Sequence, residues 1–254
     1  MVIDFLKDRP RQMFEQVLAD YTSLNDIDRA EALRLVKTDE LFKKLTVKWY
    51  DHLLSREMDR AFSVYNDDYY FIDIFQCFKT YSRVYIRQLA KNKIYNEMKS
   101  IRSFVDIGCG LSYSTCALKQ IFPAARAYAV NLRGTKQWTF CDAMSKSYDF
   151  KLVGDVKEIE SDVDLVFASE FYEHLENPIA HVRQVVTSLK PKYMVIANSF
   201  NVWAIGHFNE YYFDGRVVDQ KEAGREFNKY VRSLGYESIK CGMWNNKPLV
   251  WRKI

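Results

Sequence analysis

The chain has 254 residues, of which 48% are hydrophobic and 28% charged, and it carries a formal net charge of +4. This length and composition allow a full hydrophobic core, which excludes fibrous and intrinsically disordered classes. No apolar run approaches the roughly 20 residues of a membrane-spanning helix, and no signal-peptide core opens the chain. We therefore expect a cytoplasmic protein with no membrane partner. The basic residues are spread along the chain, so they permit a nucleic-acid partner without requiring one.

Five cysteines are scattered along the chain, with no Cys-x-x-Cys motif and no pair of histidines at zinc spacing. An odd and dispersed set favours reduced, mostly buried thiols over a disulfide framework. The sequence therefore predicts no metal site.

The first 100 residues contain no glycine and a single proline, which is typical of a helical bundle. Apolar residues recur at helical spacing in residues 12–21 and again in residues 41–53. Capping residues at 23–26 predict the start of a further helix. Asp67 and Asp68 favour the N-terminus of a long helix, because carboxylates stabilise that end of the helix dipole. Its apolar positions are Phe71, Phe75, Phe78, Tyr81 or Ser82, Tyr85 and Leu89.

From residue 102 onward, short apolar runs alternate with amphipathic segments, a pattern that predicts parallel β-α-β units. The expected strands are residues 104–107, 127–130, 151–153, 165–168 and 193–197, and the expected helices include residues 116–121, 135–147 and 179–189. Residues 236–240 and 249–253 flank a turn at 244–248 and predict a terminal hairpin. We expect an α/β fold.

One strand end carries a nucleotide-site motif. The expected strand 104–107 contains Asp106 and runs directly into Gly108 and Gly110, and a helix follows at once. Glycines let a ligand approach the backbone, and a helix start offers unpaired N–H groups. The dinucleotide fingerprint requires a third glycine where Tyr113 stands. An ordinary tight turn is the alternative interpretation.

The Asp-x-Gly-x-Gly string resembles the first motif of class I S-adenosylmethionine-dependent methyltransferases. The chain departs from that family at Ser112, where a third glycine is usual and where serine has poor access to positive φ. The segment from Ser169 to Pro178 resembles the fourth motif of the same family, a Glu-His-Leu-x-x-Pro-like turn. This resemblance implies a Rossmann-like, doubly wound, seven-stranded sheet, mostly parallel with an antiparallel C-terminal hairpin. The methyltransferase domain would span residues 101–254, behind a helical N-terminal cap of residues 1–100.

The resemblance also assigns cofactor contacts, because ligands of such sheets bind beyond the carboxyl ends of the strands. Asp106 would position the amino group of the methionine moiety, and Asp155 would accept the adenine amino group. Ser169 would face the methionine end. The remaining expected contacts are Gly108, Gly110, Ser112 and Asn131.

Asn131 stands where the family usually has an acidic residue that binds both ribose hydroxyls. It can still offer one acceptor oxygen, or it can serve as a turn residue that favours the left-handed conformation. Arg133 nearby would suit a phosphate. A 2′-phosphorylated dinucleotide or an acidic variant of the usual cofactor therefore stays open.

Two side chains are catalytic candidates. His174 has an ordinary pKa near 6.5 and is a possible general base, although it can also only order its loop. Glu170 would face the methionine end of the cofactor. The aromatic-rich segment 198–213 would form the acceptor pocket, with Asn198, Asn201 or His207 donating or accepting hydrogen bonds; a core-packing loop is the alternative.

We expect an S-adenosylmethionine-dependent methyltransferase acting on an O or N atom of a small-molecule, sugar or nucleotide acceptor. Two DNA chemistries are disfavoured, because the chain has neither a Pro-Pro-Tyr-type string after the fourth strand nor a Pro-Cys dipeptide. Nucleic-acid methylation at an unusual position is a second hypothesis. A non-catalytic cofactor sensor or assembly subunit is a third. The sequence leaves open the oligomeric state, and whether the helical cap is a lid, a nucleic-acid contact or an oligomer interface.

Overall fold

Helical segments fill the N-terminal part of the chain in a computed structural model that describes residues 8–77, 79–243 and 248–254. Phe78 and most of the expected turn at 244–248 lie outside these residues. The segments are α1 (Asp8–Asn25), α2 (Arg29–Lys37), α3 (Glu40–Leu54), α4 (Met58–Phe62), η2 (Ser63–Asn66), α5 (Asp68–Gln76), η3 (Lys79–Tyr85), α6 (Ile86–Lys91) and α7 (Ile94–Met98).

Two expectations for these helices were wrong in detail. The cap of α2 is Asp28, which accepts a hydrogen bond from the Glu31 N–H, while residues 23–25 still belong to α1. The long helix expected after Asp67 is interrupted, because α5 ends at Gln76 and the π-helical segment η3 precedes α6. A π-helix places more residues in each turn, so a stripe of apolar residues does not stay on one face.

A seven-stranded sheet follows, with strand order β3-β2-β1-β4-β5-β9-β8. Its strands are β1 (Ser103–Ile107), β2 (Arg126–Val130), β3 (Lys151–Val153), β4 (Leu165–Ser169), β5 (Tyr193–Ala197), β8 (Tyr236–Lys240) and β9 (Leu249–Lys253). All neighbours pair in parallel except β9, which is antiparallel to both β5 and β8. The expected strands and the terminal hairpin are confirmed, each within one residue at either end.

A second hairpin, β6 (Glu210–Phe213) with β7 (Arg216–Asp219), was not expected from the sequence. Its turn residues Asp214 and Gly215 both have positive φ, 46° and 83°. The Asp-Gly dipeptide between two alternating apolar runs is the sequence pattern for such a turn.

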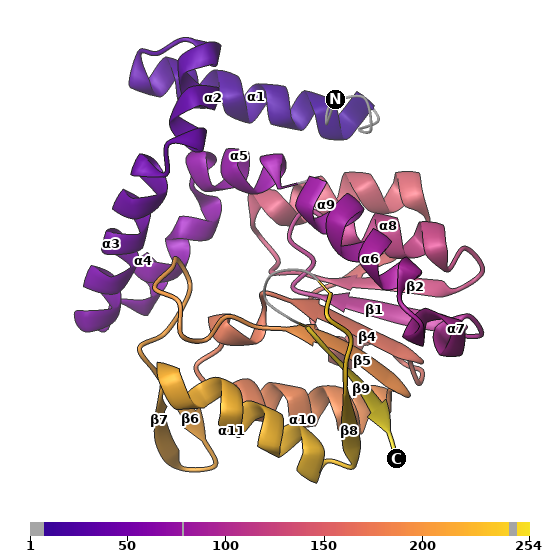
Figure 1. Cartoon of the computed structure of the whole chain (residues 1–254). Coiled ribbons are helices and arrows are strands. Elements are labelled where there is room, and N and C mark those ends of the chain that lie inside the picture. Colours follow the sequence, from indigo (N-terminus) through magenta and orange to yellow (C-terminus); the bar gives the residue numbers. More distant parts are fainter. Residues whose placement is uncertain (1–7, 78, 244–247) are drawn as a thin grey trace.

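Helices cover both faces of the sheet (Figure 1). On one face lie α8 (Tyr113–Ile121), α9 (Lys136–Tyr148) and α6, and on the other lie α10 (Pro178–Leu189) and α11 (Gln220–Ser233). The short helices η4 (Val156–Glu158) and η5 (Tyr172–His174) follow β3 and β4. Along β1 the side chains alternate between the two faces of the sheet. Phe104 and Val105 therefore belong to two different apolar clusters.

The N-terminal helices contribute to the apolar cluster that contains Phe104. The ring of Phe14 in α1 stacks on Phe75 in α5 with centroids 3.7 Å apart, and Phe75 meets Phe140 of α9 edge to face at 6.0 Å. The apolar core therefore runs without interruption from α1 to the sheet. Among the described helices, none is both long enough and apolar enough to cross a membrane.

Candidate active site

A cavity of about 460 Å³ opens beyond the carboxyl ends of β1 to β4, and most of the predicted site residues line it. Asp106, Gly108, Gly110, Asn131, Asp155, Ser169, Glu170 and His174 all contribute to its wall. Ser112, Asn198, Asn201 and His207 do not belong to the lining. The cavity thus contains most of the predicted cofactor contacts and both catalytic candidates, but none of the three residues predicted to contact the acceptor.

The glycine turn depends on backbone conformations that favour glycine. Gly108 has φ +69°, and a Cβ built there would lie 2.3 Å from Cδ2 of Phe171. Its N–H donates to the Val130 carbonyl at 3.1 Å, which ties the turn to β2. Ser112 corrects an expectation, because it does adopt positive φ (+59°) as the N-cap of α8. Its side chain is fully buried, so it supports the turn from behind.

Asp106 is 2% exposed, and both hydroxyls of Ser114 and Thr115 donate to its Oδ2 at 2.6 Å. Burial raises the pKa of Asp106 to about 6, and these hydrogen bonds only partly offset that effect. The carboxyl thereby fixes the first turn of α8 against the end of β1.

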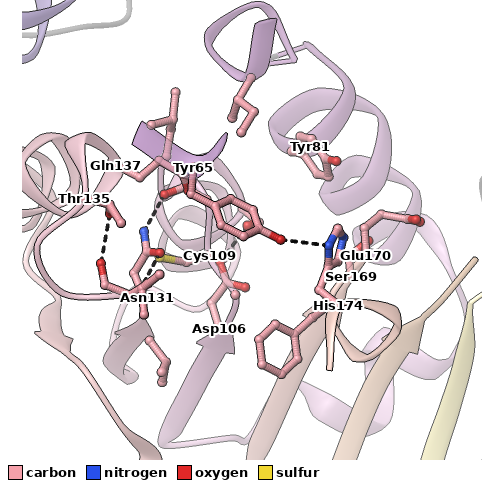
Figure 2. A pocket seen from close by; sticks show the side chains of 18 of the residues that line it. Tyr65, Tyr81, Asp106, Cys109, Asn131, Thr135, Gln137, Ser169, Glu170 and His174 are labelled. Carbon is pink, nitrogen blue, oxygen red and sulfur yellow. Dashed lines mark hydrogen bonds between the residues drawn. The ribbon is translucent and has the colours of Figure 1, made fainter. Parts of the chain in front are cut away.

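Asn131 joins the end of β2 to the glycine turn. Its Nδ2 donates to the Gly110 carbonyl at 2.8 Å, and its Oδ1 accepts from the Leu132 N–H at 2.8 Å (Figure 2). It does not adopt the left-handed conformation that a plain turn residue would favour. A carboxylate here could not donate to Gly110 and would repel its carbonyl. The departure from the acidic residue of the family thus has a structural reason.

Asp155 is exposed and forms the N-cap of η4, accepting hydrogen bonds from the Lys157 N–H and from Gln184 Nε2. Arg133 beside it pairs with Glu158 at 2.6 Å and lies over the Trp138 ring. The guanidinium is already partnered and does not line the cavity. The geometry thus gives no support to a phosphate-bearing cofactor.

Two buried polar atoms in the cavity wall have no hydrogen-bond partner in the described structure. They are Oγ of Ser169 at the end of β4 and Nδ1 of His181 in α10. Buried polar atoms are normally satisfied, so both are open to a ligand or to water. The sequence did not single out His181, because it lies on a helix face whose position only the fold defines.

Glu170, which lines the cavity just after β4, and Glu173 in η5 form a carboxyl pair. Glu170 is held at φ +54°, an uncommon conformation for a non-glycine residue. Glu173 is completely buried, and its Oε1 accepts from the Ser199 N–H at 2.7 Å. The two carboxyls are hydrogen-bonded to each other, and burial raises the pKa of both. Two neighbouring carboxyls disfavour ionisation of both at once.

Asn198, predicted as an acceptor contact, instead supports this pair. With its amide oriented to satisfy both ends, its nitrogen donates to Oε2 of Glu173 at 3.1 Å and to the Ala197 carbonyl at 3.0 Å. Asn201 is exposed at the surface.

His174 lies between the helical cap and the loop that follows β5. Its Nδ1 is 3.2 Å from the Tyr65 hydroxyl, and a Cβ on Gly206 would approach Nδ1 to 2.1 Å. Figure 2 shows Tyr65 reaching His174 across the cavity. Burial lowers the pKa of His174 to about 3, so the imidazole is neutral at physiological pH.

His207, also predicted as an acceptor contact, packs behind His174, with ring centroids 4.8 Å apart and nearly perpendicular planes. It is 4% exposed, and burial lowers its pKa to about 4. Its carbonyl accepts the indole N–H of Trp49 at 2.8 Å.

Side chains of the N-terminal helices also line the cavity, at the edge where the sequence left open a lid. They are Phe62, Tyr65, Tyr70, Ile74 and Tyr81. Only Tyr81 among them belongs to the apolar stripe predicted from helical spacing, and the tertiary arrangement brings all five to the cavity.

The sheet order, the glycine turn after β1 and the cavity at the strand ends define the fold of a class I methyltransferase. Residues 105–197 match the family model described as a methyltransferase domain. This segment is similar to that family, and the chain as a whole shares the fold of solved methyltransferases. Comparison with curated protein sequences gave no match.

Solved structures share this fold at low sequence identity. PigF with SAH aligns with 85% of this chain and 71% of its own, at 12% identity and a TM-score of 0.57. The mitomycin 7-O-methyltransferase MmcR aligns with 97% of this chain and 69% of its own, at 13% identity and a TM-score of 0.51. An O-methyltransferase family protein from Burkholderia thailandensis aligns with 73% of this chain at 10% identity and a TM-score of 0.51. The chain spans only 59% of the length of that last protein.

Proposed function

We propose that this protein transfers the methyl group of S-adenosylmethionine to an O or N atom of a small-molecule acceptor. One observation carries the proposal: a single cavity brings together the glycine turn, the carboxyl groups of Asp106 and Asp155, and the two unpartnered polar atoms of Ser169 and His181. When bound, this cofactor supplies an already activated methyl group. The protein then needs only to bind the two reactants, orient them and exclude water from them, so the proposal invokes no protein nucleophile and no metal.

The residues of the cavity fit the parts of this cofactor. Leu132 and Val156 offer apolar surface at the ends of β2 and β3, where an adenine ring would lie, with Asp155 as acceptor for its amino group. Asn131 retains one acceptor site for a ribose hydroxyl. Asp106 and Ser169 would face the methionine moiety. PigF was solved with SAH, the demethylated form of this cofactor, in the same fold.

Glu170 is the better candidate for accepting a proton from the acceptor. A general base works best when its pKa lies near the operating pH. Burial moves the pKa of Glu170 upward, towards that range, whereas it moves the pKa of His174 down to about 3. We therefore assign proton removal to Glu170 and a positioning role to His174, which contacts both Tyr65 and the Gly206 loop.

The alternative hypotheses receive less support. Among the described side chains that line the cavity, none is a lysine or arginine, so nothing there would neutralise the phosphates of a nucleic acid. The sensor hypothesis rested on Ser112 and Asn131, and both have a role in holding the glycine turn. We assign residues 1–100 to a cap over the cavity, since its aromatic side chains form the cavity roof.

Calorimetric titration with S-adenosylmethionine tests the cofactor assignment in Gly108→Ala. The added Cβ must displace Phe171 at a backbone position that already disfavours side chains, so we expect affinity to fall about tenfold or more. Gly215→Ala is the matched control, because it carries the same type of strain at φ +83° with nothing within 4 Å. Its affinity should stay within about twofold of the wild type. Equal affinity in both variants would contradict the assignment.

A further inference from the structure

The carboxyl pair of Glu170 and Glu173 has no cationic partner among the described residues that line the cavity. Among the described residues, the groups that contact it are the partner carboxyl and uncharged donors, namely the Asn198 amide, Ser199 and peptide N–H groups. When either carboxyl is ionised, no lysine or arginine among the residues that line the cavity faces that charge. A buried charge without a counter-charge is costly, so a bound cation would stabilise this site.

The neighbouring imidazoles cannot supply that positive charge. His174 and His207 both have pKa values lowered to about 3 and about 4 by burial, so both are neutral when the carboxyl pair is charged. The cavity wall adds two further carboxyl groups, those of Asp106 and Asp155, and no described lysine or arginine. The cavity therefore favours ligands with positive charge.

Aromatic rings line the same cavity as Glu170. Tyr65 and Tyr70 meet edge to face at 5.5 Å, and both line the cavity together with Phe62. Tyr81 lies close enough to Glu170 and Glu173 for their charge to help raise its pKa. Figure 2 shows Tyr81, Glu170 and His174 at one end of the cavity and Asn131 with Thr135 at the other. Aromatic faces attract organic cations, and they pack against an apolar body.

We propose that the acceptor of this enzyme is a primary amine on an aromatic or other apolar body, bound as its ammonium ion between Glu170 and the tyrosines of the cap. This inference rests on the proposed function and names its substrate class. Glu170 takes one proton from the bound ammonium group, which leaves the nitrogen lone pair free to react. Glu173 and Asn198 hold Glu170 in place from below.

Two other cations would satisfy the charge less well. Among the described residues, no group of three or more His, Cys, Asp or Glu side chains could hold a metal ion. The sulfonium of the cofactor is present in every methyltransferase of this class and does not by itself call for an aromatic cage in the helical cap. An ammonium ion on an apolar body uses both the charge and the rings.

The test measures binding of three nearly isosteric probes, benzylamine, benzyl alcohol and benzoate, to the full-length protein saturated with S-adenosylhomocysteine. We expect benzylamine to bind at least about tenfold more tightly than benzyl alcohol, and benzoate to bind most weakly. Glu170→Gln should remove the preference for the amine. Glu176→Gln, an exposed glutamate in the same turn, should keep it. Tyr81→Leu, which removes one ring and no charge, should weaken benzylamine more than benzyl alcohol.

These measurements distinguish failure of the proposed function from failure of the amine assignment. If S-adenosylhomocysteine itself does not bind, the proposed function fails before the probes are added. If it binds and the three probes bind equally or not at all, the amine assignment is overturned and the proposed function stands. The assignment is also overturned if Glu170→Gln weakens S-adenosylmethionine but not S-adenosylhomocysteine and leaves the probes unchanged, or if the purified protein retains a divalent metal that Glu170→Gln loses.

Discussion

At the residue scale, the most sharply defined group is Asp106, whose pKa burial raises from 3.8 to about 6. Because the folded protein holds this proton more tightly than the unfolded chain, the stabilisation from protonated Asp106 is complete below about pH 4 and disappears as the pH rises through about 6. A shift of about two pKa units corresponds to about 3 kcal/mol. The carboxylate is thus kept in a place that lowers the stability of the ligand-free protein at neutral pH.

Asp106→Asn should remove this pH dependence and keep the local hydrogen bonds, because both hydroxyls donate to one oxygen that the amide retains. Urea unfolding at a series of pH values measures the free energy of unfolding of both proteins. The variant should gain about 3 kcal/mol relative to the wild type between about pH 4 and pH 7. A difference between the two proteins that does not change with pH would disprove the burial argument.

At the element scale, α3 is attached to the loop after β5 through Trp49, which is 1% exposed and donates its indole N–H to the His207 carbonyl. Trp49→Phe leaves that carbonyl unpaired and the ring site underfilled, so we expect a loss of about 2–3 kcal/mol in the free energy of unfolding. Trp203→Phe is the control, because Trp203 is 54% exposed and phenylalanine can also stack on Tyr50. It should cost less than about 0.5 kcal/mol in the same denaturant titration.

The elements also show which parts of the structure were predictable. Strands such as β3 and β5 are short apolar runs with clear boundaries, so the sequence predicts where they end. Asp155 after β3 lines the cavity, whereas the predicted acceptor contacts after β5 do not. The break between α5 and η3 was not predictable from the apolar spacing, because the spacing alone does not distinguish an α-helix from a π-helical segment. Tyr65 and His181 belong to the site only through tertiary contacts between distant segments.

At the scale of the whole molecule, the apolar cluster that includes Phe14, Phe75 and Phe140 joins the helical cap to the sheet. Residues of the helical cap also line the cavity that contains the glycine turn after β1. A shared core and a shared cavity imply that cap and sheet unfold together, even though the sequence divides near residue 100. The proposed boundary therefore separates two roles within one cooperative unit.

Thermal unfolding in the presence of S-adenosylhomocysteine tests whether the cap and the sheet unfold together. Ligand at about 100 times its dissociation constant stabilises the folded state by about 2.7 kcal/mol. For a chain of this size that corresponds to a rise in the melting temperature of about 5–10 °C. Far-UV circular dichroism reports mainly the helices, and fluorescence reports tryptophans in both parts, so the two curves should coincide and move together. Gly108→Ala should unfold in one step and move at most about half as far at the same ligand concentration, because a tenfold loss of affinity leaves about 1.4 kcal/mol of stabilisation. Two separate transitions, of which the ligand moves only one, would show that the cap folds independently.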